Sequence, residues 1–118
     1  LDILIYNHDP IDRGVVVKCR PLGVLKFVDK GIQDDKILAV SNHSPIEKYN
    51  CLNDVDESNL KIYKHFFRIY KEDIKGDVKV GDWQNGNKAH EKIVAAHKAW
   101  LSTPSATISF ANKNCTRR

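Results

Sequence analysis

Four polar residues gather within eight positions between two apolar stretches: Asp29, Asp34, Asp35 and Lys36. Asp34 and Lys36 are two residues apart at the entrance to an apolar run, so in a β-strand both side chains point to one face. Mg²⁺ prefers carboxylate oxygens and water as ligands, and a lysine ammonium attracts phosphate oxygens. The group therefore suits a hard cation together with a phosphate, although a solvated acidic turn has the same composition.

Tyr70 and Lys71 form a second polar pair, at the end of a segment with helical periodicity. The apolar residues of this segment recur at intervals of three and four, which predicts an amphipathic helix of about four turns. They are Leu60, Tyr63, Phe66, Phe67 and Tyr70. From spacing alone the structural interpretation is the simpler one, because Tyr70 continues the apolar stripe and Lys71 complements the negative end of the helix dipole.

The elements that must position these groups are strands first and helices afterwards. Apolar and β-branched runs predict strands over 1–6, 15–20, 22–28, 36–40 and 78–80. Pro21, which lies between the second and third of these runs, predicts a bulge there, and Gly23 predicts a bend in the third run. Asp56 or Ser58 is expected to cap the aromatic helix, and a last helix is predicted over 87–101, which Pro104 ends. This order predicts an α+β fold with a curved sheet.

The composition is that of one domain of 118 residues without a membrane span. No apolar run approaches the ~20 residues that a spanning helix needs. All 15 acidic residues lie within residues 1–97, which hold 15 of the 19 basic ones, so the net charge of +4 comes from Lys98 onward. Residues 1–97 are therefore neutral, which argues against a basic nucleic-acid-binding face.

The cysteines and histidines exclude two other kinds of site. Cys19, Cys51 and Cys115 are odd in number and widely spaced, which favours a reducing, cytoplasmic compartment over a disulfide framework. His90 and His97 are seven residues apart and no Cys pair or His-Glu-x-x-His motif accompanies them. A structural zinc site is therefore not expected.

Both ends of the sequence are unusual. The chain contains no Met, and its first residues, Leu1 to Tyr6, have the pattern of the middle of a strand. We therefore expect an N-terminal part to be absent from this sequence. Residues 102–118 are polar and basic and are expected to form a mobile tail.

Several segments resemble soluble family I inorganic pyrophosphatases, in order and with few gaps. They are Arg-Pro-Leu-Gly-Val-Leu-Lys-Phe-Val-Asp (20–29), Gln-Asp-Asp-Lys-Ile-Leu-Ala-Val (33–40), His-Phe-Phe-Arg-Ile-Tyr-Lys (65–71) and Lys-Val-Gly-Asp-Trp (79–83). The resemblance implies a pyrophosphatase domain over 1–101, incomplete at its N-terminus, and part of a distorted five-stranded OB-like β-barrel flanked by two α-helices. Leu1-Asp2 matches the last two positions of the family signature Asp-Gly-Asp-Pro-(Leu/Val)-Asp.

The resemblance also implies a role for each matching residue. Asp2 and Asp34 would bind the metal ions that activate the attacking water, and Asp29 and Asp34 would bind a further Mg²⁺. Lys36, Tyr70 and Lys71 would hold phosphate oxygens, while the general base would lie in the absent N-terminal part. The implied reaction is Mg²⁺-dependent hydrolysis of pyrophosphate to two phosphates by direct attack of water, without a phosphoenzyme, in a homo-oligomer that binds neither nucleic acid nor membrane. Lys30 departs from the pattern, since many members carry an acid there.

The competing interpretation is an OB-like nucleic-acid-binding module. A small barrel that carries Trp83 and lysine-rich strands could bind a single strand. The neutral balance of residues 1–97 argues against this interpretation. If the resemblance holds, residues 1–118 alone are expected not to hydrolyse pyrophosphate at the family's rate.

Overall fold

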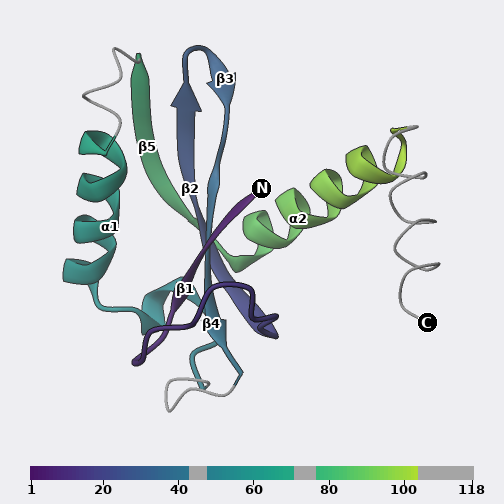
Figure 1. The fold of residues 1–118 in the computed structure, drawn as a ribbon. Coiled ribbons are helices and arrows are strands. Elements are labelled where there is room, and N and C mark those ends of the chain that lie inside the picture. Colours follow the sequence, from purple (N-terminus) through teal and green to yellow (C-terminus); the bar gives the residue numbers. More distant parts are fainter. Residues whose placement is uncertain (43–47, 71–76, 104–118) are drawn as a thin grey trace, which may run out of the picture.

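A computed structural model describes residues 1–42, 48–70 and 77–103. Within these ranges, five strands, two α-helices and one short 3₁₀ helix follow one another (Figure 1). They are β1 (Asp2–Tyr6), β2 (Cys19–Asp29), β3 (Ile32–Gln33), β4 (Lys36–Ser41), η1 (Leu52–Asp54), α1 (Glu57–Ile69), β5 (Val78–Asn85) and α2 (Gly86–Leu101). The predicted α+β class, with strands first and a helix at each predicted place, is confirmed.

The long strand β2 organises the sheet, because three other strands pair with it. The strand order is β1-β4-β2-β3, and β5 also pairs with β2. Only the β1–β4 pair is parallel, and it places Asp2 opposite Lys36. No pairing closes this five-stranded sheet into a barrel within the residues that the structure describes.

The strand predicted over 15–20 is wrong in its first part. Gly14 turns the chain at φ 89°, and β2 begins only at Cys19. Val16 is 97% exposed, so its β-branched side chain has no packing surface, and β-propensity alone does not make a strand without such a surface. The bulge expected at Pro21 is confirmed, since the β2–β4 register shifts between Pro21 and Gly23.

The core lies where β2 and β4 are covered by the helices. Phe67 of α1 packs with Leu25 and Phe27 of β2, and their side chains form one buried cluster. Ala89 and Ile93 of α2 pack with Val24 and Ile37. Since Leu25 and Val24 are neighbours in β2, the two helices cover opposite faces of this strand.

Both helices leave part of their apolar side chains exposed. In α1, Asp56 occupies the N-cap position without a side-chain capping hydrogen bond, and Phe67 is buried while Phe66 remains 50% exposed. In α2, His97 and Trp100 stack on each other at 6.4 Å between ring centroids and are both exposed. Figure 1 shows why: the second half of α2 extends away from the sheet. No helix in the described part of the chain is long and apolar enough to cross a membrane.

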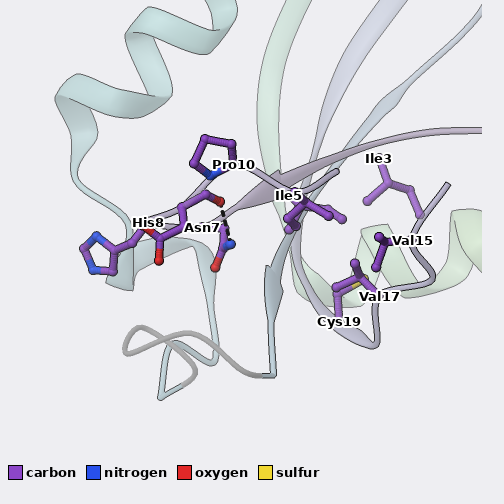
Figure 2. A pocket seen from close by; sticks show the side chains of 10 residues that line it. Ile3, Ile5, Asn7, His8, Pro10, Val15, Val17 and Cys19 are labelled. Atoms are coloured by element: carbon purple, nitrogen blue, oxygen red, sulfur yellow. Dashed lines mark hydrogen bonds between the residues drawn. The ribbon is translucent and has the colours of Figure 1, made fainter. Parts of the chain in front are cut away.

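An apolar hollow lies between β1 and residues 10–18 (Figure 2). Ile3, Ile5, Val15, Val17 and Cys19 gather around it. Its rim also carries Asn7, His8 and Asp9, but its lining includes none of Asp2, Asp29, Asp34, Lys36 and Tyr70. The candidate site that the sequence indicates therefore lies elsewhere.

Gly23 makes the closest backbone approach of the sheet. A Cβ at this position would lie 2.6 Å from Leu52 Cδ1 and 2.7 Å from the carbonyl oxygen of Gln84 in β5. We expect Gly23→Ala to lower the free energy of unfolding by about 1–3 kcal/mol, because a backbone carbonyl cannot move aside without disturbing the sheet. Chemical denaturation measures the change.

Gly86→Ala is the matched control for Gly23→Ala. A Cβ on Gly86 would meet its nearest neighbour, the carbonyl oxygen of Leu22, at 3.4 Å. Gly86 is the first residue of α2, where alanine restricts the unfolded chain. This variant should therefore be as stable as the parent or slightly more stable. Equal stability of the two variants would show that the sheet accommodates an added methyl group at residue 23 without loss of stability.

Candidate active site

Lys36, the first residue of β4, carries an ammonium group into the protein interior. Its side chain is only 2% exposed. The Nζ atom lies 4.9 Å from the ring centroid of Phe27 and 6.0 Å from that of Phe67. A buried ammonium is costly unless it is paired, so the surroundings of Lys36 must supply negative charge.

Asp2 and Asp34 supply that charge from two different segments. Lys36 Nζ donates to Asp2 Oδ2 at 2.6 Å and to Asp34 Oδ2 at 2.7 Å. The parallel register of β1 and β4 brings Asp2 opposite Lys36, while the strand period of two brings Asp34 to the same face. The prediction that Asp34 and Lys36 share a face is confirmed.

The two carboxylates are partly exposed to solvent, although the lysine that they contact is buried. The Asp2 side chain is 68% exposed and that of Asp34 is 37% exposed. Burial of Lys36 lowers the pKa of its ammonium, but hydrogen bonds and Coulombic attraction from Asp2 and Asp34 outweigh this effect and raise the pKa above its ordinary value. Lys36 is therefore a fixed positive charge at neutral pH.

Asp29 ends β2 on the same hairpin that carries Asp34. The turn between β2 and β3 has Lys30 at φ 52° and Gly31 at φ 78°. The Lys30 N–H donates to the carbonyl oxygen of Asp77 at 2.9 Å, which fastens the turn to the residue before β5. Glycine at 31 suits a positive φ, whereas Lys30 adopts it at some cost. The departure at position 30 therefore coincides with unusual backbone geometry beside Asp29.

Tyr70 follows α1 and belongs to the aromatic cluster under Lys36. Its N–H donates to the carbonyl oxygen of Phe66, and its ring lies 5.9 Å from that of Phe67. Phe67 in turn contacts the Phe27 ring edge-on at 6.0 Å. Tyr70 is thus in contact with a ring that neighbours the Lys36 ammonium, and its side chain is 43% exposed. Lys71, predicted beside it, lies outside the described residues.

Asp35 makes contacts in this region that the sequence did not predict. The sequence pattern shows Asp35 only as one member of the polar group, but its side chain points away from those of Asp34 and Lys36. Burial raises the pKa of the Asp35 carboxyl, but hydrogen bonds from the Phe27 N–H, Lys26 and Lys92 outweigh this effect and leave the pKa below its ordinary value. Lys26 belongs to β2 and Lys92 to α2, so spacing in sequence could not connect them with Asp35.

The arrangement places acidic groups, which suit a cation, beside an ammonium group, which suits a phosphate. The ammonium of Lys36 lies between the carboxylates of Asp2 and Asp34. Within the described ranges no three or more His, Cys, Asp or Glu residues form a ready ligand set. Any metal ion held by Asp2 or Asp34 would therefore need water or phosphate oxygens as further ligands, which is usual for Mg²⁺.

Comparisons with known proteins agree with one another. The family model described as inorganic pyrophosphatase matches residues 1–101. The inorganic pyrophosphatase of Escherichia coli (strain K12) is 38% identical over 100 residues, which cover 81% of this chain and 57% of that protein. That of Agrobacterium fabrum (strain C58) is 39% identical over 100 residues, covering 81% and 56%.

Solved structures give the same result. The inorganic pyrophosphatase of Neisseria gonorrhoeae superposes with a TM-score of 0.78 at 31% identity and covers 85% of this chain and 60% of that one. The Helicobacter pylori enzyme gives 0.77 at 30% identity, covering 85% and 61%. The chain thus spans 57% of the length of the Escherichia coli relative.

Proposed function

Since this chain belongs to the inorganic pyrophosphatase family, we propose that the protein hydrolyses inorganic pyrophosphate to two phosphates with the help of Mg²⁺. The observation that carries the proposal is the group Asp2–Lys36–Asp34, in which one buried ammonium contacts two partly exposed carboxylates. Acidic groups for metal ions and a lysine for phosphate oxygens are what such a reaction requires.

The residues present fit divalent metal ions. Asp2 and Asp34 would hold the ions near the attacking water, and Asp29 with Asp34 would hold a further ion that arrives with the substrate. When bound, such ions lower the pKa of water and stabilise the charge of an in-line transition state. Carboxylate oxygens suit hard divalent cations such as Mg²⁺, Mn²⁺ and Ca²⁺, and among these we propose Mg²⁺ as the cofactor.

The other named groups would bind pyrophosphate. Lys36 would exchange part of its contact with the carboxylates for phosphate oxygens, which neutralises charge that develops during the reaction. Tyr70 and Lys71 would hold the oxygens of substrate and leaving group. Water would attack phosphorus directly, with no phosphoenzyme. None of the described residues is assigned as the general base.

We further propose that the protein works as a homo-oligomer in the cytoplasm. Half-exposed apolar side chains such as Phe66 and Trp100 support contacts with a second copy. The odd number and wide spacing of the cysteines support a reducing compartment.

The nucleic-acid-binding alternative is not favoured. The family match and the named relatives are all pyrophosphatases. Residues 1–97 are neutral, whereas affinity for nucleic acid depends mainly on neutralising phosphates.

Phosphate release from pyrophosphate, measured against Mg²⁺ concentration, tests the proposed function. In the full-length protein we expect release that requires Mg²⁺ and stops with a chelator, whereas residues 1–118 alone are expected to release phosphate more slowly. A salt-sensitive mobility shift with single-stranded DNA, in a full-length protein that releases no phosphate, would reverse the assignment in favour of the alternative.

Tyr70→Phe separates a role in substrate binding from a role in folding. The change keeps the ring that packs on Phe67 and removes only the hydroxyl. We expect a raised KM or a lowered turnover with a nearly unchanged melting temperature, since loss of one hydrogen bond costs about 1 kcal/mol. Normal kinetics with a large loss of stability would return Tyr70 to a purely structural role.

A further inference from the structure

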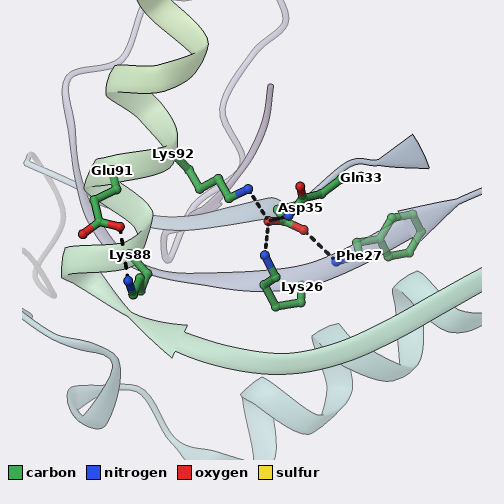
Figure 3. Close-up of polar contacts among 7 residues, drawn as sticks. All are labelled: Lys26, Phe27, Gln33, Asp35, Lys88, Glu91 and Lys92. Atoms are coloured by element: carbon green, nitrogen blue, oxygen red, sulfur yellow. Dashed lines mark hydrogen bonds and ion pairs between the residues drawn. The ribbon is translucent and has the colours of Figure 1, made fainter. Parts of the chain in front are cut away.

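Asp35 is a buried carboxylate with four hydrogen-bond donors around it (Figure 3). Its side chain is 2% exposed. Oδ1 accepts the Phe27 N–H at 3.0 Å. Oδ2 accepts Lys26 Nζ at 2.9 Å, Gln33 Nε2 at 3.0 Å and Lys92 Nζ at 3.1 Å. Both carboxylate oxygens are therefore satisfied by the protein itself.

The Oδ1 contact replaces a missing bond of the sheet. Regular pairing of β2 with β4 ends at Leu25 and Lys36, and β2 continues beside β3. In the gap, Phe27 is held twice, because the Asp34 N–H donates to its carbonyl oxygen at 2.8 Å while its own N–H donates to Asp35. An unsatisfied buried N–H is costly, so Asp35 stabilises an irregular stretch of backbone.

This irregular stretch carries the groups of the candidate site. Asp34 and Lys36 flank Asp35 on the opposite face of the chain. The ring of Phe27 lies under the Lys36 ammonium at 4.9 Å. A shift of residue 27 or 35 would therefore move the ring, the carboxylate of Asp34 and the ammonium relative to one another.

Helix α2 reaches the same carboxylate through Lys92. Ile93, the next residue of α2, packs against the cluster of Val24, Ile37 and Ala89. The side chains of Lys26 and Lys92 are each 35% exposed, so these two ion pairs are open to water on one side. Asp35, the residue just before β4, thus connects β2 with α2 on the side of the chain opposite the candidate site.

We propose that Asp35 is a positioning residue of the pyrophosphatase site, which fixes Phe27 and the Asp34–Lys36 segment and is itself held from α2 by Lys92. This inference rests on the proposed function, because it assumes that Asp34 and Lys36 bind the metal ion and phosphate. Asp35 touches neither ligand and acts through its neighbours.

Two variants of Asp35 in the full chain separate positioning from charge. Asp35→Asn keeps an oxygen for the Phe27 N–H, whereas Asp35→Ala removes it. We expect Asp35→Ala to raise the dissociation constant of Mn²⁺, followed by electron paramagnetic resonance without pyrophosphate, by about tenfold, the effect typical of residues that orient metal ligands. Asp35→Asn keeps the hydrogen bond to the Phe27 N–H but loses the ion pairs with Lys26 and Lys92. It should therefore raise the dissociation constant by less than Asp35→Ala, by about two- to fivefold, as expected for loss of partly exposed ion pairs. Equal losses in both variants, or no loss in either, would overturn the proposal.

Lys92→Met tests the contact from α2 in a partly exposed position, where the fold is not at risk. We expect the Mn²⁺ dissociation constant to rise about two- to fivefold, the range of a partly exposed ion pair. If Asp35→Ala fails to fold, this variant decides the matter, and unchanged Mn²⁺ affinity would overturn the proposal. Val55→Ala, in the cluster around Leu22 and Leu38, is the matched control that lowers stability without changing Mn²⁺ affinity.

Kinetics distinguish this inference from the proposed function. In an active full-length parent, Asp35→Ala should raise the KM and the Mg²⁺ requirement, and Asp35→Asn should restore both in part. A parent that binds Mn²⁺ but releases no phosphate would contradict the proposed function alone. The Mn²⁺ affinities of the variants would still decide the role of Asp35.

Discussion

Replacing Asp34 by asparagine in the full-length protein is expected to lower the rate of pyrophosphate hydrolysis by on the order of a hundredfold and to raise the Mg²⁺ concentration for half-maximal rate. Residues that merely support metal ligands already cost ~10–100-fold when changed, and Asp34 would itself contact both the water-activating ion and the substrate-borne ion. The amide keeps the shape of the side chain but loses the charge that attracts the ions. Phosphate release over a range of Mg²⁺ concentrations measures both effects.

Asp82→Asn is the matched control for Asp34→Asn. Asp82 lies on β5, its side chain is 95% exposed, and it pairs with Lys64. Removing one negative charge there should leave the Mg²⁺ dependence unchanged, because exposed charges are screened by salt. If Asp34→Asn retains the parent's turnover at both limiting and saturating Mg²⁺, Asp34 is not a metal ligand.

The sequence predicted the part of this site that depends on local periodicity. Asp34 and Lys36 share a face because strand side chains alternate, and two residues of spacing suffice to know it. The aromatic stripe likewise predicted α1, and Asp56, one of the two expected cap residues, occupies its N-cap position. Such features follow from neighbours in sequence alone.

The remainder of the site depends on pairings between distant segments. The contact between Asp2 and Lys36 needs the parallel register of β1 with β4, 34 residues apart. Periodicity cannot choose that partner, and only the resemblance to a known family placed Asp2 in the site. The four donors around Asp35 also come from three separate elements, so the buried carboxylate resembled an ordinary loop residue.

The wrong strand start at residues 15–18 and the exposed second half of α2 have one physical cause. Residues 15–18 have β-propensity but no paired strand, and the second half of α2 has apolar residues but no sheet beneath it. In both cases tertiary contact decides the outcome, and propensity is only a weak prior. A periodic pattern of apolar residues shows which side chains can be buried, but it does not show which other element of the fold will cover them.

Neutralising both carboxylates around Lys36 is expected to destabilise the fold strongly. The double variant Asp2→Asn, Asp34→Asn leaves the buried ammonium of Lys36 near Phe27 and Phe67 without the two carboxylates that now pair with it. Removing the partner of a buried charge costs about 3–5 kcal/mol. Without the carboxylates, burial should bring the pKa of Lys36 below its ordinary value, since the effect that raises it is gone. Urea denaturation at neutral pH measures the loss of stability.

Lys36→Met should have a much smaller effect on stability, although both changes break the same ion pairs. The lysine is the buried partner, with a side chain 2% exposed, whereas Asp2 and Asp34 are 68% and 37% exposed and can be solvated once it is gone. A methionine fills similar space and packs well against aromatic rings. We expect a change within about 1 kcal/mol, since replacing a buried ion by an apolar group is often neutral. Hydrolysis should nevertheless fall sharply, because the group that would hold phosphate is lost.

Combining the three changes completes a thermodynamic cycle. Adding Lys36→Met to the double variant removes the stranded ammonium, so the triple variant should recover most of the lost stability while remaining inactive. A triple variant no more stable than the double variant would show that the carboxylates stabilise the fold through contacts other than Lys36. Recovery would instead show that this lysine is retained at a cost in stability that its two carboxylates offset, as expected for a group kept for binding phosphate rather than for folding.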